Sequence, residues 1–483
     1  MNNAKTIVRR TPQPLQSAIA GDVFVPGDAG YDEARRAFLL GVDQRPSVIV
    51  LPESAEDVVR AVRFAHANGM RIAPQGTGHG AVPLEPLEGA MLIKTSRMRR
   101  VDISPASRTA RAEAGAQWQD VTVPAAAHGL AALAGTSPNV GVTGYTLGGG
   151  IGWLSRRHGL AANSVRAAEV VTADGRLTRA DAGRNADLYW AVRGGGGSVG
   201  VVTALEMALF PVRELYAGVL FFPIERSFKV LRAWRDWTDT VRDEVTSIAR
   251  ILRVPPFPEV PEPLRGRAFA LVEAAYLGDH VTGAHVLRPL RELRPELDTF
   301  ATIAAPALQA LHMDPAEPVA GEADGALLSD FTAGAIDAVM ALAGPNADTP
   351  LSSVEIRHLG GALAREAPGC GAQPKIDAEF AVLAAGLTPT PELRDAVRAQ
   401  ARAMKDALAP WRATYDYYNF AEAPSEADAV LPRDAYRCLQ QIKARYDPDE
   451  ALISAHPVRP AESPQPELCR SRDDDGYANQ AKE

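Results

Sequence analysis

Glycines gathered in three short segments carry the clearest chemical signal in this chain. The segments are Gly76-Thr77-Gly78-His79-Gly80, residues 139–165 and residues 187–203. Successive backbone N–H groups in glycine-rich turns form concavities that bind anions, and the absence of Cβ lets the chain touch a pyrophosphate. The first loop has the size that a phosphate group needs. The sequence therefore predicts a site for a ligand that carries phosphate.

One glycine run formally matches the fingerprint of NAD-binding Rossmann folds, namely Gly195-x-Gly197-x-x-Gly200. In those folds the fingerprint follows a strand and opens a helix, whose N-terminus receives the pyrophosphate. Here the glycines precede the strand-like run 201–210, in which residues alternate at period two. An NAD-binding Rossmann site is therefore disfavoured.

The elements that position the first loop follow from the pattern before it. Residues 47–53 are a β-branched run that ends at a proline, and Ser54 with Asp57 has capping-box spacing ahead of a helical apolar pattern. Gly69 ends that helix, and a short apolar segment leads into the first glycine loop. The sequence predicts a strand-helix-strand unit over 47–78.

The rest of the chain alternates between strand and helix patterns. The strand-like segments become longer after about residue 213. Pro124 is expected near the first turns of one helix, where proline is tolerated. Strands are expected at 90–95, 108–115, 167–173, 201–210, 353–359, 375–387 and 415–420. Helices are expected at 117–128, 185–191, 227–242, 283–293 and 433–444, and an alanine-rich helical zone at 303–345.

Composition excludes several classes of protein. Of 483 residues, 46% are hydrophobic and 23% are charged, which suits a folded globular chain, and the net charge of -8 disfavours nucleic acid as a partner. The three cysteines, Cys370, Cys438 and Cys469, are too far apart for a disulfide framework or a zinc site. We therefore expect no metal. No signal peptide or long apolar span is evident, so we also expect no membrane partner and a cytoplasmic location.

The glycine segments, together with Tyr417-Tyr418-Asn419-Phe420 and the terminal KARYDPDEAL, resemble the FAD-linked oxidases that include berberine bridge enzyme and glucooligosaccharide oxidases. These belong to the vanillyl-alcohol-oxidase type of flavoprotein. The resemblance covers nearly the whole chain. It implies an α+β fold with a two-subdomain FAD-binding domain and a substrate domain whose large antiparallel sheet is flanked by helices. The expected boundaries are 1–213 and 415–462 for the FAD domain, 214–414 for the substrate domain and 463–483 for a flexible tail.

The resemblance also implies how the flavin is attached. His79 occupies the place of the family's histidine that bonds the flavin 8α-methyl group. Many relatives add a second bond from a cysteine, but Ser137 stands at that position, and a hydroxyl is a far poorer nucleophile than a thiolate. We therefore expect FAD with one covalent bond. Val140 lies where a valine in this family accompanies fast reaction with O2, although the alternative is that it only fills space.

By the same resemblance, further residues are expected to contact FAD. They are Pro74, Gln75, Gly76, Thr77, Gly78, Gly80, Ser137, Pro138, Val140, Gly141, Gly144, Tyr145, Gly148, Gly149, Gly150, Gly152, Trp153, Gly159, Leu160, Asn163, Gly200, Val201, Val202, Tyr417 and Asn419.

In relatives that oxidise sugars, the tyrosine matching Tyr417 takes a proton from the substrate hydroxyl. A phenol with the ordinary pKa of about 10 needs help for that task. Glu355 and Asp377, with Glu379 as a further candidate, are carboxylates on the expected roofing strands. The alternatives are that Tyr417 is plain aromatic packing and that these carboxylates are solvated, because alternation cannot say which face meets the flavin.

Two histidines and two arginines receive structural interpretations. His358 near Glu355 is more simply a partnered structural histidine than a group that orients substrate. Arg156, Arg157 and His158 are expected to form a polar patch beside the glycine turn.

The expected function is an FAD-dependent oxidase that transfers a hydride from a small organic substrate to flavin N5 and passes electrons to O2, giving H2O2. The substrate class stays open among alcohols, sugars, alkaloids and polyketides, and the chain is expected to be a monomer or homodimer. Two alternatives remain: a flavoprotein dehydrogenase with another electron acceptor, and a non-catalytic flavoprotein that binds a drug or alkaloid.

Overall fold

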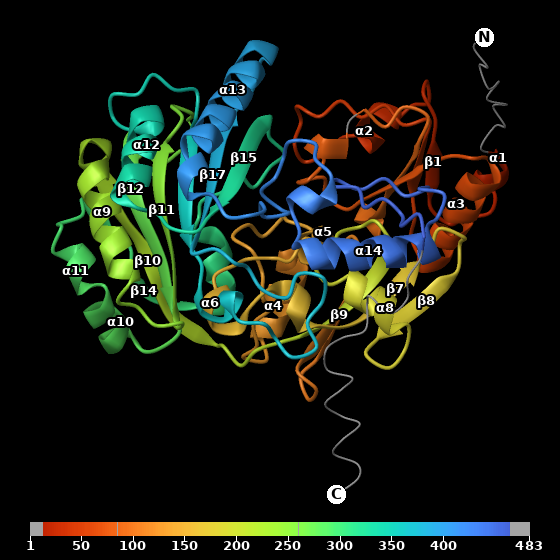
Figure 1. Ribbon diagram of the computed structural model, residues 1–483, viewed down its shortest axis with the longest axis horizontal. Coiled ribbons are helices and arrows are strands. Elements are labelled where there is room, and N and C mark those ends of the chain that lie inside the picture. The colour runs from red at the N-terminus through yellow and green to blue at the C-terminus, as the bar shows by residue number, and fades with distance from the viewer. Residues whose placement is uncertain (1–12, 85, 259, 464–483) are drawn as a thin grey trace, which may run out of the picture.

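The computed structural model describes residues 13–84, 86–258 and 260–463. Three β-sheets lie side by side across the molecule, with helices packed on the outer sheet to the left in Figure 1. The first two sheets use residues 22–208, and the third uses residues 214–387. The expected tail after residue 463 and Cys469 lie outside the described residues.

The first sheet contains the expected strand-helix-strand unit. Its strands are β1 (Asp22–Phe24), β2 (Val48–Leu51), β4 (Met91–Lys94) and β3 (Ile72–Gln75), in that spatial order, and β2, β4 and β3 run parallel. The Ser54 hydroxyl caps α3 (Ala55–Ala67) by accepting the Asp57 N–H at 3.2 Å. The Asp57 carboxylate in turn accepts the backbone N–H groups of Glu53 and Gly21. The predicted cap is therefore present, and it also ties β1 to the helix.

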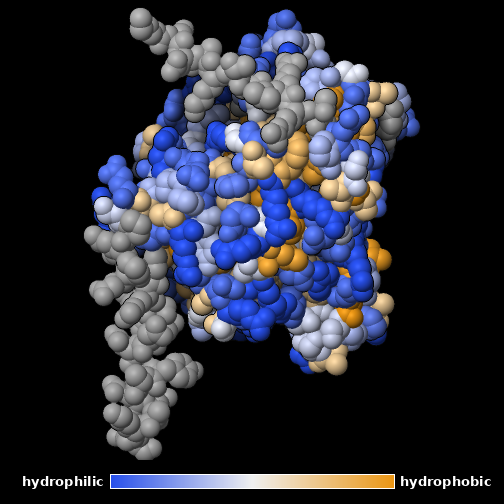
Figure 2. All heavy atoms as spheres, turned by 90° about the vertical axis from the view of Figure 1, so that its right-hand side faces the viewer, coloured by the Kyte–Doolittle hydropathy of each residue, from blue (hydrophilic) through white to orange (hydrophobic). Residues whose placement is uncertain are grey.

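Helix α3 buries one apolar face and leaves the opposite face polar. Val58, Val59 and Val62 pack with Val50 and Ile93 in one core cluster. The surface on this side of the molecule, which lies to the right in Figure 1, is mostly hydrophilic with hydrophobic residues gathered near its centre (Figure 2). Periodicity thus assigned this helix correctly, because a helix on a sheet needs only one apolar stripe.

The second sheet has the order β5-β6-β9-β7-β8. Its strands are β5 (Val101–Ser104), β6 (Thr109–Glu113), β9 (Val201–Ala208), β7 (Val165–Val171) and β8 (Leu177–Asp181). Near it lie α4 (Trp118–Ala126), α5 (Val142–Leu147) and α8 (Ala186–Ala191), and the late helix α14 (Arg433–Tyr446) returns to contact α8. Leu439 of α14 shares a core cluster with Leu205 of β9, so the end of the chain completes the first half of the molecule.

The third sheet is antiparallel, with the order β13-β10-β12-β11-β16-β17-β15 and β14 paired to β10. Its strands are β10 (Glu214–Pro223), β11 (Val245–Arg253), β12 (Ala268–Tyr276), β13 (Leu297–Asp298), β14 (Ala301–Ala304), β15 (Gly321–Leu328), β16 (Ser353–His358) and β17 (Phe380–Leu387). Helices α9 (Ser227–Thr238), α12 (Ala333–Ala343) and α13 (Pro391–Ala407) cover its outer face (Figure 1).

Alternation along these strands separates an apolar face from a charged face. Val354 and Ile356 of β16 join the core beneath the helices. Glu355 and Arg357 each follow one of these residues in the sequence. Their side chains therefore point to the opposite face, as the period of two requires. The inner face of the sheet therefore presents charged side chains toward the first half of the molecule.

Shorter elements complete the described chain. They are α1 (Gln13–Gln16), α2 (Tyr31–Ala34), α6 (Ser155–His158), α7 (Ala161–Ser164), α10 (His280–Val286) and α11 (Arg288–Arg291). None of the helices in the described ranges is both long and apolar enough to span a bilayer.

Several sequence expectations about elements are wrong. Residues 415–420 were expected to be a strand, but they form bends and a turn. Strand β17 begins at Phe380 and leaves out 375–379, and the zone 303–345 contains strand β15 as well as helix. Pro124 lies late in α4 and not in its first turns. Aromatic residues favour strands only where a neighbouring strand is available, which explains the error at 415–420.

Candidate active site

A cavity of about 420 Å³ lies where the glycine-rich loops meet the inner face of the third sheet. One wall consists of residues 74–81, 135–147 and 196–202, and the opposite wall carries His312, Asp314, Glu355 and Arg357. Residues 417–422 and 453–456 close the remaining side. Segments that are far apart in sequence therefore line one cavity.

The first glycine loop brings His79 into the cavity wall beside a phenyl ring. The imidazole stacks on Phe38 with ring centroids 3.7 Å apart. Gly78 has φ +86, and a Cβ there would lie 2.8 Å from the Ala37 Cβ, so the loop passes closely over the segment that carries Phe38. Burial lowers the pKa of His79 to about 4, against the opposing effects of Asp314 and Asn139. His79 is therefore a neutral imidazole, and its Nε2 has no hydrogen-bond partner among the described residues.

The second glycine segment divides into a part that lines the cavity and a part that supports it. Gly141 and Gly144 line the cavity, but Gly148, Gly149, Gly150 and Gly152 do not. A Cβ on Gly148 would collide with the Asn419 amide, and one on Gly152 with the Ala134 carbonyl. The glycine run thus lets the chain pack tightly beneath the Tyr-x-Asn motif.

Tyr417 reaches the cavity from the turn that was expected to be a strand. Its side chain is buried, with 3% exposed, and its hydroxyl oxygen accepts the Gly150 N–H at 2.9 Å and the Asn419 amide at 3.1 Å. Asn419 also donates to the Tyr145 carbonyl at 3.0 Å. Burial raises the pKa of Tyr417 well above its ordinary value, while the donated hydrogen bonds lower it. The phenol is therefore held in one orientation with its own proton retained.

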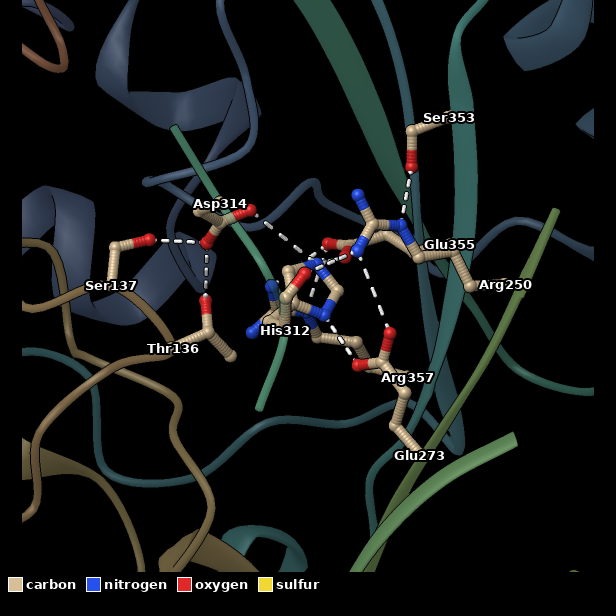
Figure 3. A network of polar contacts seen from close by, with 9 residues as sticks. All are labelled: Thr136, Ser137, Arg250, Glu273, His312, Asp314, Ser353, Glu355 and Arg357. Atoms are coloured by element: carbon tan, nitrogen blue, oxygen red, sulfur yellow. Dashed lines mark hydrogen bonds and ion pairs between the residues drawn. The ribbon is translucent and has the colours of Figure 1, made fainter. Parts of the chain in front are cut away.

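Glu355 belongs to a network of charged side chains on the sheet wall (Figure 3). Its two carboxylate oxygens contact His312 Nε2 at 2.7 Å and the Arg357 guanidinium at 2.9 Å. On the other side of the ring, His312 Nδ1 lies 2.5 Å from a Glu273 oxygen. Burial opposes ionisation of Glu355, but Arg357 and His312 outweigh it and hold its pKa well below the usual range. Glu355 is therefore an ionised and fully engaged carboxylate.

His312 is the charged centre of this network. Burial and Arg250 disfavour its positive charge, but Glu273, Asp314 and Glu355 overcome them and raise its pKa to about 9. Arg250 donates to the His312 carbonyl at 2.6 Å and lies 3.5 Å from Glu273. Buried charges of opposite sign thus compensate one another on the sheet wall.

Asp314 joins the two walls of the cavity. Its carboxylate accepts hydrogen bonds from the hydroxyls of Ser137 and Thr136 and lies 3.8 Å from His312 Nε2 (Figure 3). Asn139 of the same loop donates to the Pro315 and Ala316 carbonyls. Residues 136–139 are therefore fastened by hydrogen bonds to residues 314–316, which precede β15.

Asp377 lies away from the cavity, contrary to its expected role beside Tyr417. It is exposed and pairs with Lys375 at 3.1 Å, because it precedes the first residue of β17. Glu379 is also exposed. His358 is buried behind the sheet wall, where Arg156 Nη1 lies 3.0 Å from its Nε2. Burial, Arg156 and Arg235 lower the pKa of His358 to about 3. Arg156 is itself buried, whereas Arg157 is exposed and His158 is half-buried.

Of the residues expected to contact FAD, some line the cavity and some lie behind it. Those in the lining are Pro74, Gln75, Gly76, Thr77, Gly78, Gly80, Ser137, Val140, Gly141, Gly144, Tyr145, Gly200, Val202, Tyr417 and Asn419. Those outside the lining are Pro138, Gly148, Gly149, Gly150, Gly152, Trp153, Gly159, Leu160, Asn163 and Val201.

Five ionisable residues in the lining were not anticipated: His312, Asp314, Arg357, Glu422 and His456. His312 and Asp314 fall in the zone read as helix, where no local pattern indicates a cavity. Arg357 shares a face with Glu355 by alternation, which is a signal that was available. Glu422 follows the Tyr-x-Asn motif by three residues, but nothing in its neighbours points to the cavity.

The loop wall fits a large polar ligand, and FAD in particular. Both side-chain polar atoms of Gln75, the Thr143 hydroxyl and the Tyr145 hydroxyl are buried without a hydrogen-bond partner in the described part of the chain. With His79 Nε2, these groups surround the same cavity. Buried polar groups of this kind are costly unless a ligand or water satisfies them. No group of three or more potential metal-binding side chains occurs within the described ranges.

Comparisons with known proteins agree with a flavin site. A family model described as an FAD binding domain matches residues 46–181. (R)-6-Hydroxynicotine oxidase of Paenarthrobacter nicotinovorans is 35% identical over 204 residues, which cover 42% of this chain and 44% of that protein. The uncharacterised FAD-linked oxidoreductase YvdP of Bacillus subtilis is 30% identical over 311 residues, which cover 63% of this chain and 67% of that protein. The chain spans about half the length of the first curated relatives that it matches.

Solved structures share the fold over almost the whole chain. The BBE-like 1 protein of Physcomitrella patens superposes with a TM-score of 0.80 at 19% identity, covering 94% of this chain and 100% of that one. Glucooligosaccharide oxidase of Acremonium strictum, whose structure is described as containing 6-S-cysteinyl, 8α-N1-histidyl FAD, gives 0.78 at 22% identity, covering 94% and 100%. These neighbours have the vanillyl-alcohol-oxidase type of FAD-binding fold, as the sequence predicted.

Proposed function

Because the chain belongs to the family of FAD-linked oxidoreductases that includes berberine bridge enzyme-like proteins and glucooligosaccharide oxidase, we propose that it is an oxidase using one covalently bound FAD and O2. The observation that carries the proposal is the single cavity into which His79, Tyr417 and three glycine-rich segments converge. The FAD-binding domain would comprise 1–213 and 415–462, and the substrate domain 214–414.

The loop wall would hold the cofactor. The N–H groups of the glycine-rich turns suit its diphosphate, and the unpaired groups of Gln75, Thr143 and Tyr145 would find partners on its polar atoms. When bound, FAD would accept a hydride from the substrate and deliver two electrons to O2, which yields H2O2. The protein would position the reactants and control proton movement.

His79 would provide the single covalent attachment. A neutral imidazole with an unprotonated nitrogen is the nucleophilic form of histidine, and burial keeps His79 in that form by lowering its pKa to about 4. Phe38 restricts the rotation of the ring by stacking on it. Ser137 supplies no thiolate for a second bond, and its hydroxyl is already engaged with Asp314.

Tyr417 would hold the reacting hydroxyl or amine of the substrate and relay its proton, taking up the substrate proton as its own phenolic proton passes to water. Two donors already point at the phenolic oxygen, so the oxygen can carry negative charge as the proton is exchanged. Glu355 would not take the proton itself, because both of its oxygens are engaged and its pKa is held low. Its contribution would be to keep His312 charged and Arg357 in place.

The proposal is tested with purified protein under anaerobic conditions. Sugars, benzylic alcohols, alkaloids and polyketides are each added, and loss of the yellow flavin absorbance identifies a substrate. Air is then admitted, and H2O2 is measured against the flavin that was reduced. One H2O2 per flavin supports an oxidase. Reduced flavin that persists for minutes in air would instead identify a dehydrogenase, and tight binding without bleaching would identify a non-catalytic flavoprotein.

A further inference from the structure

Glu422 is a carboxyl in the cavity lining that the proposed reaction does not use. It follows the turn that carries Tyr417 and Asn419, and its Oε2 accepts the Ala323 N–H at 3.2 Å. Ala323 lies in β15, at one end of the third sheet. Among the residues that the structure describes, no cationic side chain forms an ion pair with Glu422.

The carboxylates around Glu422 already have cationic partners. Glu322 forms two hydrogen bonds with Arg398, at 2.8 and 2.9 Å. Asp324 lies 3.4 Å from Lys405, which also contacts Asp416 at 2.9 Å. These cations are therefore committed to other acids and leave Glu422 as the excess carboxyl.

The network on the sheet wall supplies no spare cation either. Arg250, Arg357 and protonated His312 face the carboxylates of Glu273, Glu355 and Asp314, as the dashed contacts in Figure 3 show. Each cation is paired with one or more of these acids. When Glu422 ionises, the charge of the described cavity wall that no neighbour compensates is negative.

We propose that the cavity selects substrates with a positively charged amine, which pairs with the carboxylate of Glu422. This inference rests on the proposed oxidase function and narrows its substrate to basic amines. The aromatic rings of Tyr417 and Phe420 line the same cavity and suit the apolar part of such a molecule. A neutral sugar would provide no counter-charge and would not favour the ionised form of Glu422.

The protonation state of Glu422 supports this assignment. Withdrawal from water raises its pKa to about 8, with further increases from Glu322 and Asp324 and a decrease from Arg398 and the Ala323 N–H. In the empty cavity at neutral pH the carboxyl is largely protonated. A bound cation favours the ionised form, so binding of a permanent cation must strengthen as pH rises toward 8.

The test measures binding of benzyltrimethylammonium, a permanent cation that has no proton to lose, and of benzyl alcohol as the uncharged reference. Titration calorimetry on the flavin-loaded protein is run from about pH 6 to about pH 8.5. We expect the cation to bind at least about tenfold more tightly than the alcohol near pH 8, and to weaken toward pH 6.

Glu422→Gln keeps an oxygen for the Ala323 N–H and removes only the charge. The variant should lose at least about tenfold in affinity for the cation, lose the rise with pH, and bind benzyl alcohol as the wild type does. His312 also titrates near this range, but it is unchanged in the variant, so a rise that persists would belong to His312. Asp395→Asn, which removes an exposed charge from α13, is the matched control and should bind both probes normally.

Equal affinity for both probes in the wild type, or unchanged cation binding in Glu422→Gln, would overturn the inference. Loss of FAD from Glu422→Gln would also overturn it, because the carboxyl would then serve the cofactor. The oxidase proposal is judged separately by peroxide release. An active oxidase that ignores the cation refutes this inference alone, and a cation-binding protein that never reduces its flavin refutes the oxidase proposal alone.

Discussion

The two walls of the cavity are built in opposite ways. The loop wall is uncharged and contains buried polar groups without partners, such as Gln75, Thr143 and Tyr145. The sheet wall is charged, and His312, Glu355 and Arg357 satisfy one another. Unpaired groups require a ligand to complete them, whereas a paired network is complete before any ligand binds. This difference supports the proposal that the loop wall holds the cofactor and that the sheet wall sets the electrostatics of the substrate space.

The largest effect is expected from replacing His79, the residue on the loop wall that is proposed to bond FAD. His79→Ala should abolish covalent attachment, so that all FAD appears in the supernatant after acid precipitation. Wild-type protein should keep its FAD in the pellet. His158→Ala, a half-buried histidine outside the cavity, is the matched control and should keep the covalent flavin. Acid-stable flavin in His79→Ala would show that another residue forms the bond.

The free energy of unfolding should depend on pH because of His312 on the sheet wall. The folded-state pKa of His312 is raised to about 9 from its ordinary 6.5, so its stabilisation is complete below pH 6.5 and is lost as pH rises through 9. By the rule of 1.36 kcal/mol per pKa unit, the loss should be about 3 kcal/mol in the free energy of unfolding. Urea unfolding at several pH values measures it.

Two variants test whether the loss of unfolding free energy at high pH comes from His312. Glu422 titrates in the same window, so the measurement is repeated in Glu422→Gln, where the Glu422 contribution is absent. His312→Gln should have lower stability at pH 6.5 and a flatter profile above it. A profile in His312→Gln as steep as that of the wild type would show that the imidazole is not charged in the folded protein.

The next largest effect is expected on the rate of flavin reduction when the hydroxyl of Tyr417 is removed. Tyr417→Phe keeps the ring and deletes the hydroxyl that Gly150 and Asn419 hold. Loss of a proton acceptor usually slows the step about 100-fold or more, and stopped-flow anaerobic flavin reduction measures that rate. Tyr415→Phe, in the same segment but outside the cavity lining, should reduce its flavin normally. Wild-type reduction in Tyr417→Phe would remove Tyr417 from the proton transfer.

The smallest expected effect concerns oxygen at the loop wall. Val140 is half-buried in the cavity lining, and Val140→Leu adds a methylene to the wall of the proposed flavin site, where O2 must approach. Reoxidation of the reduced flavin by aerated buffer should slow about tenfold, while anaerobic reduction by substrate is unchanged. Equal reoxidation rates in both proteins would leave Val140 as a space-filling residue.

Local signals were sufficient for the loop wall. The β-branched strand, the Ser54 cap and the ending at Gly69 predicted the unit that leads into the His79 loop, and that unit is present. The fold type was predicted from the resemblance and is confirmed by the structural neighbours. Contiguous motifs succeed here because turns and caps depend on neighbouring residues.

Which carboxylates are buried in the cavity wall could not be predicted from local signals. Glu355 and Asp377 looked alike in sequence, yet Glu355 is buried in the network and Asp377 is exposed before β17 begins. Alternation shows which residues share a face, but not which face meets the cavity or where a strand starts. The turn at Tyr417 was missed for a related reason, since Tyr417 and Tyr418 pack against glycine-rich segments and not against a partner strand.

The sequence alone determined the strand-helix-strand unit, the glycine-rich loops and the place of His79, because each depends on residue types at short, fixed spacing. Only the tertiary structure decided which charges meet. His312 is charged because Glu273 and Glu355 reach it from two different strands, and Glu422 is left without a counter-charge because Arg398 and Lys405 are engaged elsewhere. Protonation depends on distances and burial in space, and neither is encoded in local sequence.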